Sequence, residues 1–84
     1  MSSQEWSPLS LRVVAEADPG ALARVLEHFQ NLNVLPRKVV AEWGIADTCH
    51  IQIDIAGLSE AAVNLIATKL GQVPWVVNAY WHHA

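Results

Sequence analysis

Apolar and polar residues alternate over positions 9–16, where the apolar residues on one face are Leu9, Leu11, Val13 and Ala15. A spacing of two residues is typical of a β-strand with one buried face. From residue 22 the spacing changes to about 3.6 residues, the period of an amphipathic helix. The apolar stripe of this helix comprises Leu22, Val25, Leu26, Phe29 and Leu32. The pattern therefore predicts a strand followed by a helix.

Asp18, Pro19 and Gly20 separate these two elements. An aspartate carboxylate can accept hydrogen bonds from the free N–H groups of a first helical turn, so we predict that Asp18 is the N-cap. Pro19 suits the first helical position, which needs no donor. Asn33 follows the stripe and is predicted to be the left-handed residue that ends the helix.

The next segments predict a β-hairpin. Residues 34–44 suit a second strand, and Pro36 favours an edge position because it cannot donate to a sheet ladder. Residues 44–47 have the length of a tight connection. Residues 48–55 alternate most clearly, with an apolar face of Cys49, Ile51, Ile53 and Ile55.

A second helix and a fourth strand complete the pattern. Ser59 is predicted to cap the helix, whose expected stripe comprises Ala62, Leu65, Ile66, Lys69 and Leu70. Pro74 prevents the helix from continuing, and residues 75–81 are rich in β-forming side chains. We expect a flexible N-terminal arm at residues 1–8 and a short C-terminal tail at residues 82–84.

The predicted order is β-α-β-β-α-β. Two right-handed β-α-β units with a hairpin between them give an α+β, ferredoxin-like sandwich. We therefore expect a four-stranded antiparallel sheet with two helices on one face, formed by residues 9–81. The length of 84 residues allows one small domain.

Composition narrows the class of protein. Hydrophobic residues make up 52% of the chain, which is incompatible with a disordered protein and favours self-association. The net charge of -3 and the lack of a Lys/Arg run argue against nucleic acid as a partner. No apolar run reaches the roughly 18 residues that a membrane span requires. A single cysteine and a start without a signal pattern indicate a cytoplasmic protein.

Candidate catalytic groups are few. His50 and Asp54 share one strand face, but residues four apart on a strand are separated by about 13 Å, so a solvated face is the simpler interpretation. Cys49 lies on the apolar face and is predicted to be a structural thiol. His82 and His83 supply too few ligands for a selective metal site. We therefore expect no metal, no cofactor and no enzymatic activity, with an enzyme using His50 or Asp54 as the weakest alternative.

The run Asp18-Pro19-Gly20-Ala21-Leu22-Ala23-Arg24-Val25-Leu26, followed later by Asn33-Val34, resembles the opening of an ACT domain. Within that family the likeness is to the small regulatory subunits of acetolactate synthase. The resemblance implies a regulatory domain that binds an amino acid or a related metabolite and modulates an enzyme's catalytic subunit. It also implies a homodimer joined through sheet edges.

The same resemblance implies where a ligand would bind. One wall would be Asp18, Pro19, Gly20 and Ala21, and the other wall would be Val34 and Leu35 of a neighbouring subunit. Free N–H groups at the helix start suit a ligand carboxylate, whereas the Asp18 carboxylate would bind a ligand ammonium and repel a carboxylate.

Two other interpretations stay open. The Asp-Pro-Gly run also serves as a simple strand-to-helix stop signal in any α/β protein. In addition, the four tryptophans and the surplus of apolar residues suit a ligand-free module that holds an enzyme assembly together.

Overall fold

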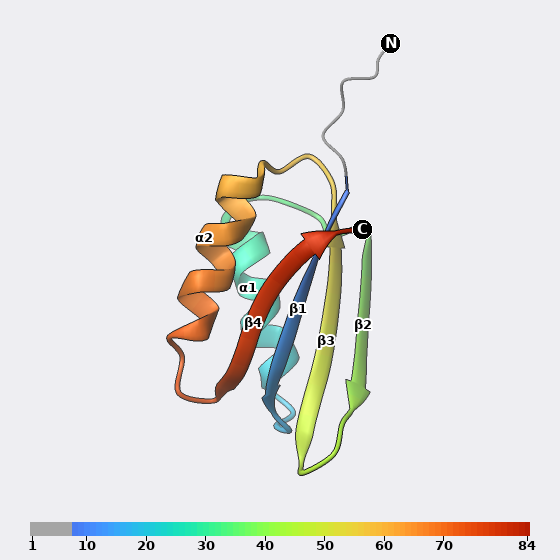
Figure 1. Ribbon diagram of the computed structural model, residues 1–84, viewed down its shortest axis with the longest axis vertical. Helices are drawn as coiled ribbons and strands as arrows, with labels where there is room; N and C mark the ends of the chain where they lie inside the picture. The colour runs from blue at the N-terminus through green and yellow to red at the C-terminus, as the bar shows by residue number, and fades with distance from the viewer. Residues whose placement is uncertain (1–7) are drawn as a thin grey trace.

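The computed structural model describes residues 8–84 and contains six elements in the predicted order (Figure 1). The predicted arm at residues 1–8 lies outside the described residues, apart from Pro8. The six elements are β1 (Leu9–Glu16), α1 (Ala21–Asn31), β2 (Lys38–Trp43), β3 (Thr48–Ile55), α2 (Glu60–Gly71) and β4 (Val76–His83).

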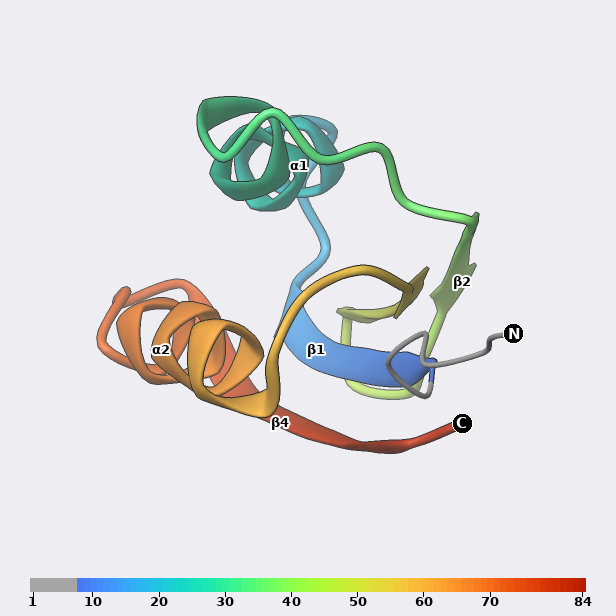
Figure 2. The same cartoon turned by 90° about the horizontal axis from the view of Figure 1, so that it is seen from above.

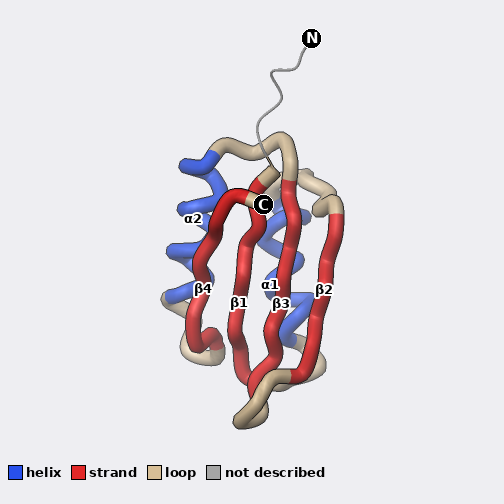
Figure 3. The backbone as a smooth tube through the Cα atoms, turned by 45° about the vertical axis from the view of Figure 1, so that its right-hand side comes forward, coloured by secondary structure: helices blue, strands red, loops and turns tan. Residues whose placement is uncertain are grey.

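The four strands form one antiparallel sheet in the order β2-β3-β1-β4. Viewed from above, both helices lie on one side of this sheet (Figure 2), and the opposite face is open to the viewer in Figure 3. The ferredoxin-like α+β fold predicted from the sequence is therefore confirmed. The predicted edge position of β2 is also confirmed, since β2 pairs with β3 alone.

The core lies between the sheet and the helices. Every second residue of the central strands points into it, as the alternation predicts, and both helices contribute one stripe. Its fully buried large side chains include Leu11, Val13, Ile51, Ile53, Val25, Phe29, Val63 and Leu70. Burial of each such side chain stabilises the fold by about 1.5–3 kcal/mol.

The start of α1 differs from the prediction. The N-cap residue is Gly20, and no side chain caps the helix. The main chain of Asp18 makes the turn instead, because its carbonyl accepts the N–H of Ala21 at 2.9 Å. The predictions of Asp18 as N-cap and Pro19 as first helical residue were therefore wrong, since the Pro-Gly pair lies in a turn before the helix.

The end of α1 confirms the role of Asn33, whose φ of 58° is left-handed. The Asn33 N–H donates to the Gln30 carbonyl and the Val34 N–H donates to the Phe29 carbonyl, both at 2.9 Å. These two bonds are the pair that defines a Schellman motif. The motif satisfies carbonyls that the helix end leaves without a partner.

Helix α2 confirms one prediction and corrects another. The Ser59 hydroxyl accepts the N–H of Ala62 at 3.1 Å, which is the predicted cap. The buried stripe, however, is Val63, Ile66, Ala67 and Leu70. Leu65 and Lys69, which the apolar pattern places in the stripe, are exposed. The helix has apolar residues on several sides, so the pattern alone did not fix its orientation.

The bounds of β2 and β4 also differ from the prediction. Strand β2 begins at Lys38 rather than at residue 34, because residues 34–37 form a connection that contributes one bond, from the Arg37 N–H to the Asp54 carbonyl at 2.8 Å. Strand β4 continues to His83, which pairs with Leu9. The predicted tail at 82–84 is therefore mostly strand, since β1 extends far enough to pair with it.

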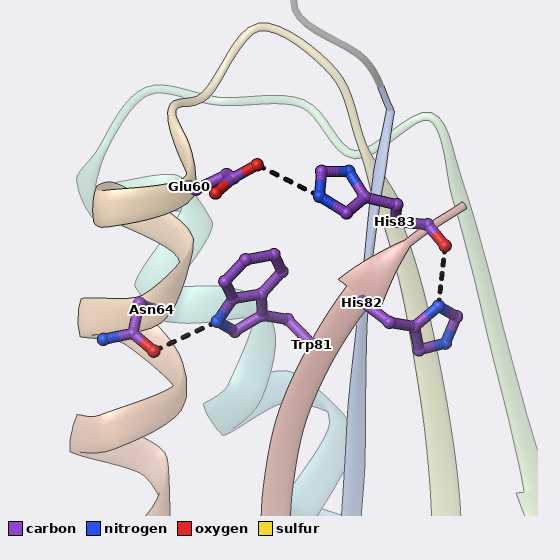
Figure 4. A network of polar contacts seen from close by, with 5 residues as sticks. All are labelled: Glu60, Asn64, Trp81, His82 and His83. Carbon is purple, nitrogen blue, oxygen red and sulfur yellow. Dashed lines mark hydrogen bonds and ion pairs between the residues drawn. The ribbon is translucent and has the colours of Figure 1, made fainter.

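Side-chain contacts connect α2 to β4 near the C-terminus (Figure 4). The indole N–H of Trp81 donates to the Asn64 side-chain oxygen at 3.0 Å. One turn earlier on α2, the Glu60 carboxylate lies 3.0 Å from Nε2 of His83. The last residues of the chain are thus attached to the helix as well as to the sheet.

The corrected caps give a matched pair of variants. Ser59→Ala removes a side-chain cap and should lower the free energy of unfolding by about 1 kcal/mol. Asp18→Ala removes no cap bond and should cost less than about 0.5 kcal/mol, as for an exposed ion pair. Urea denaturation followed by circular dichroism measures both values. A larger loss for Asp18→Ala than for Ser59→Ala would contradict the cap assignment.

Candidate functional site

The loop between β1 and α1 is held by main-chain bonds at both ends. The Ala17 N–H donates to the Asp47 carbonyl of the β2–β3 hairpin at 2.9 Å, and the Gly20 carbonyl accepts the Arg24 N–H at 3.1 Å. The loop therefore has a fixed place beside the hairpin and at the N-terminal end of α1. This is the segment that the resemblance to ACT domains implies as one wall of a ligand site.

The charge of Asp18 has a partner within the same chain. Its carboxylate lies 3.7 Å from the Arg24 guanidinium, with side-chain exposures of 49% and 56%. The guanidinium also lies over the Trp75 ring, 5.7 Å from its centroid. An exposed pair of this kind adds little stability, but it lowers the net negative charge that a ligand would meet at Asp18.

Gly20 has an ordinary right-handed conformation, with φ -85° and ψ -7°. The atoms closest to a Cβ at this position would be Asp18 Oδ2 at 3.6 Å and Arg24 Nε at 3.7 Å, which are normal contacts. The fold itself therefore does not require glycine here.

A cavity of about 350 Å³ lies next to this loop. Ala17, Asp18 and Pro19 form one side, and the other side comes from the end of β2 and the start of β3. Those residues are Ala41, Glu42, Trp43 and Cys49. The volume falls within the range of small-molecule pockets, roughly 300–1,000 Å³.

Ala41 and Trp43 were missed by the sequence reasoning. The register pairs Ala41 with Ile51 and Trp43 with Cys49, so both lie on the helix side of the sheet. No helix of the described chain covers Trp43, which is 78% exposed. The alternation of Val39, Ala41 and Trp43 was the available signal, but its meaning depended on the strand pairing. The other described tryptophans, Trp75 and Trp81, pack partly against the core.

Val34 and Leu35 lie at the opposite end of α1 from the Asp18 loop. An eleven-residue helix separates them, a length of about 16 Å. They line a different cavity, of about 480 Å³, together with Leu26, Phe29 and Val39. One copy of the chain thus places Asp18 and Pro19 at the loop cavity, whereas Gly20 and Ala21 do not line it and Ala21 is buried. It does not bring Val34 and Leu35 to this loop.

The remaining polar candidates form neither a metal site nor a catalytic pair among residues 8–84. No cluster of three or more His, Cys, Asp or Glu side chains occurs there. The Asp54 carboxylate accepts hydrogen bonds from Ser10 and Gln52, not from His50. Cys49 is a half-buried free thiol at the cavity beside the loop.

The fold is a small α+β sandwich with a cavity beside the loop that joins its first strand to its first helix. Residues 3–84 match a family model described as an ACT-like domain, and the chain belongs to this family. ACT domains are ligand-binding regulatory modules rather than catalytic ones. A search of curated proteins found no match for the sequence.

Solved structures have the same fold at low sequence identity. The C-terminal domain of the MgtC protein from Mycobacterium tuberculosis is 16% identical, with a TM-score of 0.77, covering 100% of this chain and 94% of that one. The ACT domain of GTP pyrophosphokinase from Chlorobium tepidum is 14% identical, with a TM-score of 0.74, covering 94% of this chain and 100% of that one. An uncharacterized protein from Thermotoga maritima is 18% identical, with a TM-score of 0.71 and coverages of 92% and 95%.

Neither helix of the described residues has the length and apolar character needed to span a membrane.

Two glycines provide a test of the loop geometry. Gly20→Ala should raise the free energy of unfolding by about 0.4–1 kcal/mol, because the native conformation accepts a Cβ and the unfolded chain loses freedom. Gly57 has a φ of 89°, so Gly57→Ala should lower the free energy by about 1 kcal/mol or more. Thermal unfolding measures both. If Gly20→Ala destabilises the protein as Gly57→Ala does, the loop conformation described above is wrong.

Proposed function

We propose that this chain is a cytoplasmic sensing domain that binds an amino-acid-type small molecule, dimerises and modulates a metabolic enzyme. The observation that carries the proposal is the cavity beside Asp18 and Pro19, at the N-terminal end of α1. Its lining is mainly apolar, and Asp18 and Glu42 are the two acidic residues that border it. Membership of the ACT-like family supports the same conclusion.

The edge strand β2 supports a homodimer. An unprotected edge offers main-chain donors and acceptors to another strand. Exposed apolar side chains surround this edge: Leu35 at 88%, Trp43 at 78% and Ile45 at 87% exposed. Such side chains are typical of a subunit contact rather than of a free surface.

A two-fold β2–β2 pair would also complete the ligand site. In an antiparallel pair the start of one strand lies beside the end of the other, and two-fold symmetry makes the two contacts equivalent. Leu35, which precedes β2, would then approach the Asp18 loop of the second copy, which lies beside the end of β2. This arrangement would join the two predicted walls that a single chain keeps apart.

The proposed partner is a catalytic subunit of the acetolactate synthase type. The support for it is the likeness of the Asp18–Leu26 segment and of Asn33-Val34 to the regulatory subunits of that enzyme. We propose no catalytic role for the chain itself. In this view it acts by changing the stability or conformation of its partner when ligand binds.

A ligand-free assembly module is the second candidate. The exposure of Leu35, Trp43 and Ile45 favours this candidate, because a protein partner that covers these apolar side chains accounts for them without any small-molecule ligand. The two candidates share the dimer contact and differ in whether the cavity beside Asp18 is ever occupied.

Thermal unfolding with each of the twenty amino acids tests the sensing function. A ligand at 100 times its Kd adds about 2.7 kcal/mol, which raises Tm by roughly 10 °C or more in a domain of this size. We expect the ligand's ammonium to face Asp18, so Asp18→Asn should weaken binding roughly fivefold, as for an exposed ion pair.

The control variant is Glu27→Gln, which removes the same charge from an exposed position on α1 away from the loop. It should leave the affinity unchanged. If no amino acid or related metabolite shifts Tm, the sensing function fails and the assembly module is favoured. Tighter binding by Asp18→Asn would reverse the proposed orientation, with the ligand carboxylate at Asp18.

The dimer contact can be broken without breaking the sheet. The Gly44 N–H donates to the Thr48 carbonyl at 2.8 Å. Along an antiparallel strand, residues whose N–H points to the partner strand alternate with residues whose N–H points away. Ala41 lies three residues before Gly44, so its N–H points away from β3. Ala41→Pro removes that outward donor and should convert a dimer to a monomer, measured by light scattering. Exposed Ala61→Pro in the first turn of α2, where proline is tolerated, should leave the dimer intact. A wild-type chain that is monomeric at millimolar concentration would disprove the edge contact.

A further inference from the structure

The sheet face opposite the helices carries its own ordered set of side chains. The strand register places Val40, Gln52, Arg12 and Tyr80 in one row across all four strands. The next row contains Glu42, His50, Val14 and Asn78. Figure 3 shows that neither helix covers this face.

A cavity of about 410 Å³ lies over these two rows, and Trp43, Gly44 and Ile45 close its end at the β2–β3 hairpin. Its volume is again in the range of small-molecule pockets, roughly 300–1,000 Å³. Glu42 and Trp43 border both this cavity and the one beside Asp18, since both residues lie at the sheet edge. The other lining residues of the two cavities are different.

Arg12 is held in place by a chain of hydrogen bonds. Its Nε donates to the Ser10 hydroxyl at 3.3 Å, and that hydroxyl donates to Asp54 at 3.0 Å. The Gln52 amide also donates to the Asp54 carboxylate, at 3.1 Å. Ser10 is only 1% exposed, so the middle of this chain is shielded from water.

The bond to Ser10 uses Nε, and within residues 8–84 no hydrogen bond uses the two terminal amino groups of the Arg12 guanidinium. Within residues 8–84, no ion pair involves Arg12. Two parallel N–H groups on a guanidinium match the two oxygens of a carboxylate. Holding the side chain in advance lowers the entropy cost of binding.

The His50 ring lies at the hairpin end of the same cavity. A Cβ on Gly44 would collide with the His50 ring and lie 2.6 Å from the Thr48 hydroxyl oxygen, so the ring sits directly over the Gly44 backbone. Arg12 and His50 are diagonal neighbours on β1 and β3, a Cα separation of about 7–8 Å. Val14 and Val40 lie in the same two rows and give the cavity an apolar floor.

We propose that this helix-free face is a second binding site, which takes a small organic monocarboxylate with an apolar or aromatic body. The carboxylate binds Arg12, and the body lies on Val14 and Val40 with Tyr80 and His50 at its sides. Glu42 disfavours a more highly charged anion such as phosphate, because it adds a negative charge to the cavity. The site uses the opposite sheet face from the Asp18 loop and does not depend on ligand binding there.

Titration of the ¹⁵N-labelled full chain with benzoate tests the proposal by NMR. Benzoate should give saturable shifts at the amides of Arg12, His50 and Gln52. Benzamide, which has the same ring without the charge, should bind at least about tenfold more weakly, because a charge-assisted bidentate contact is lost. Inorganic phosphate should also bind more weakly than benzoate.

Variants separate this site from the loop site. Arg12→Gln should weaken benzoate binding about tenfold, and Arg12→Lys should recover only part of the loss because an ammonium lacks the planar fork. Arg24→Gln removes the same charge on the helix side and should leave benzoate binding unchanged. The dispersion of each variant's spectrum reports whether it is folded.

The proposal is overturned if benzoate gives no saturable shift at these three amides, or if folded Arg12→Gln binds it as tightly as wild type. Stronger binding of phosphate or equal binding of benzamide would overturn the ligand class. Shifts confined to residues 17–21 would assign benzoate to the loop site and exclude the helix-free face. If benzoate does not bind the helix-free face, the proposed sensing function is not contradicted, because that function is tested by the binding of amino acids beside Asp18.

Discussion

The pairing of β1 with a strand on each side is the constraint on which the rest of the structure depends. Leu11 lies opposite Ile53 on β3 and opposite Trp81 on β4, and it is fully buried. A shift of one residue in this register would turn Arg12 into the core and Leu11 into solvent. Because that exchange is so unfavourable, the register fixes both the start of the Asp18 loop and the place of Arg12 on the opposite face.

The sequence predicted most securely the elements whose apolar spacing has a single interpretation. Strand bounds of 9–16 and 48–55 agree with β1 and β3, because strict alternation leaves one face to bury. Asp18 failed as a cap since its carbonyl makes the turn and its carboxylate lies beside Arg24. The start of β2 and the end of β4 depended on how far their neighbours extend, which a local pattern does not contain.

The candidate site was predictable only on the side that is continuous in sequence. Asp18, Pro19 and Gly20 stand together in the chain, so a motif could indicate them. Ala41 and Trp43 join them only through the β2–β3 register. The chain of bonds from Arg12 through Ser10 to Asp54 could not be predicted for the same reason, since Ser10 and Asp54 lie on different strands and are 44 residues apart in sequence.

Strand β2 connects the two cavities physically. Glu42 and Trp43 of this strand line both cavities, and β2 is an edge of the sheet, whereas β3, which also borders both cavities, is a central strand. A second strand added to β2 would therefore cover part of each cavity at once, on opposite faces of one extended sheet. Occupancy of either cavity would then change the free energy of the same contact, which is the thermodynamic requirement for coupling between two sites. An exposed edge strand is in this way better suited than a buried core strand to carry a ligand signal to a partner.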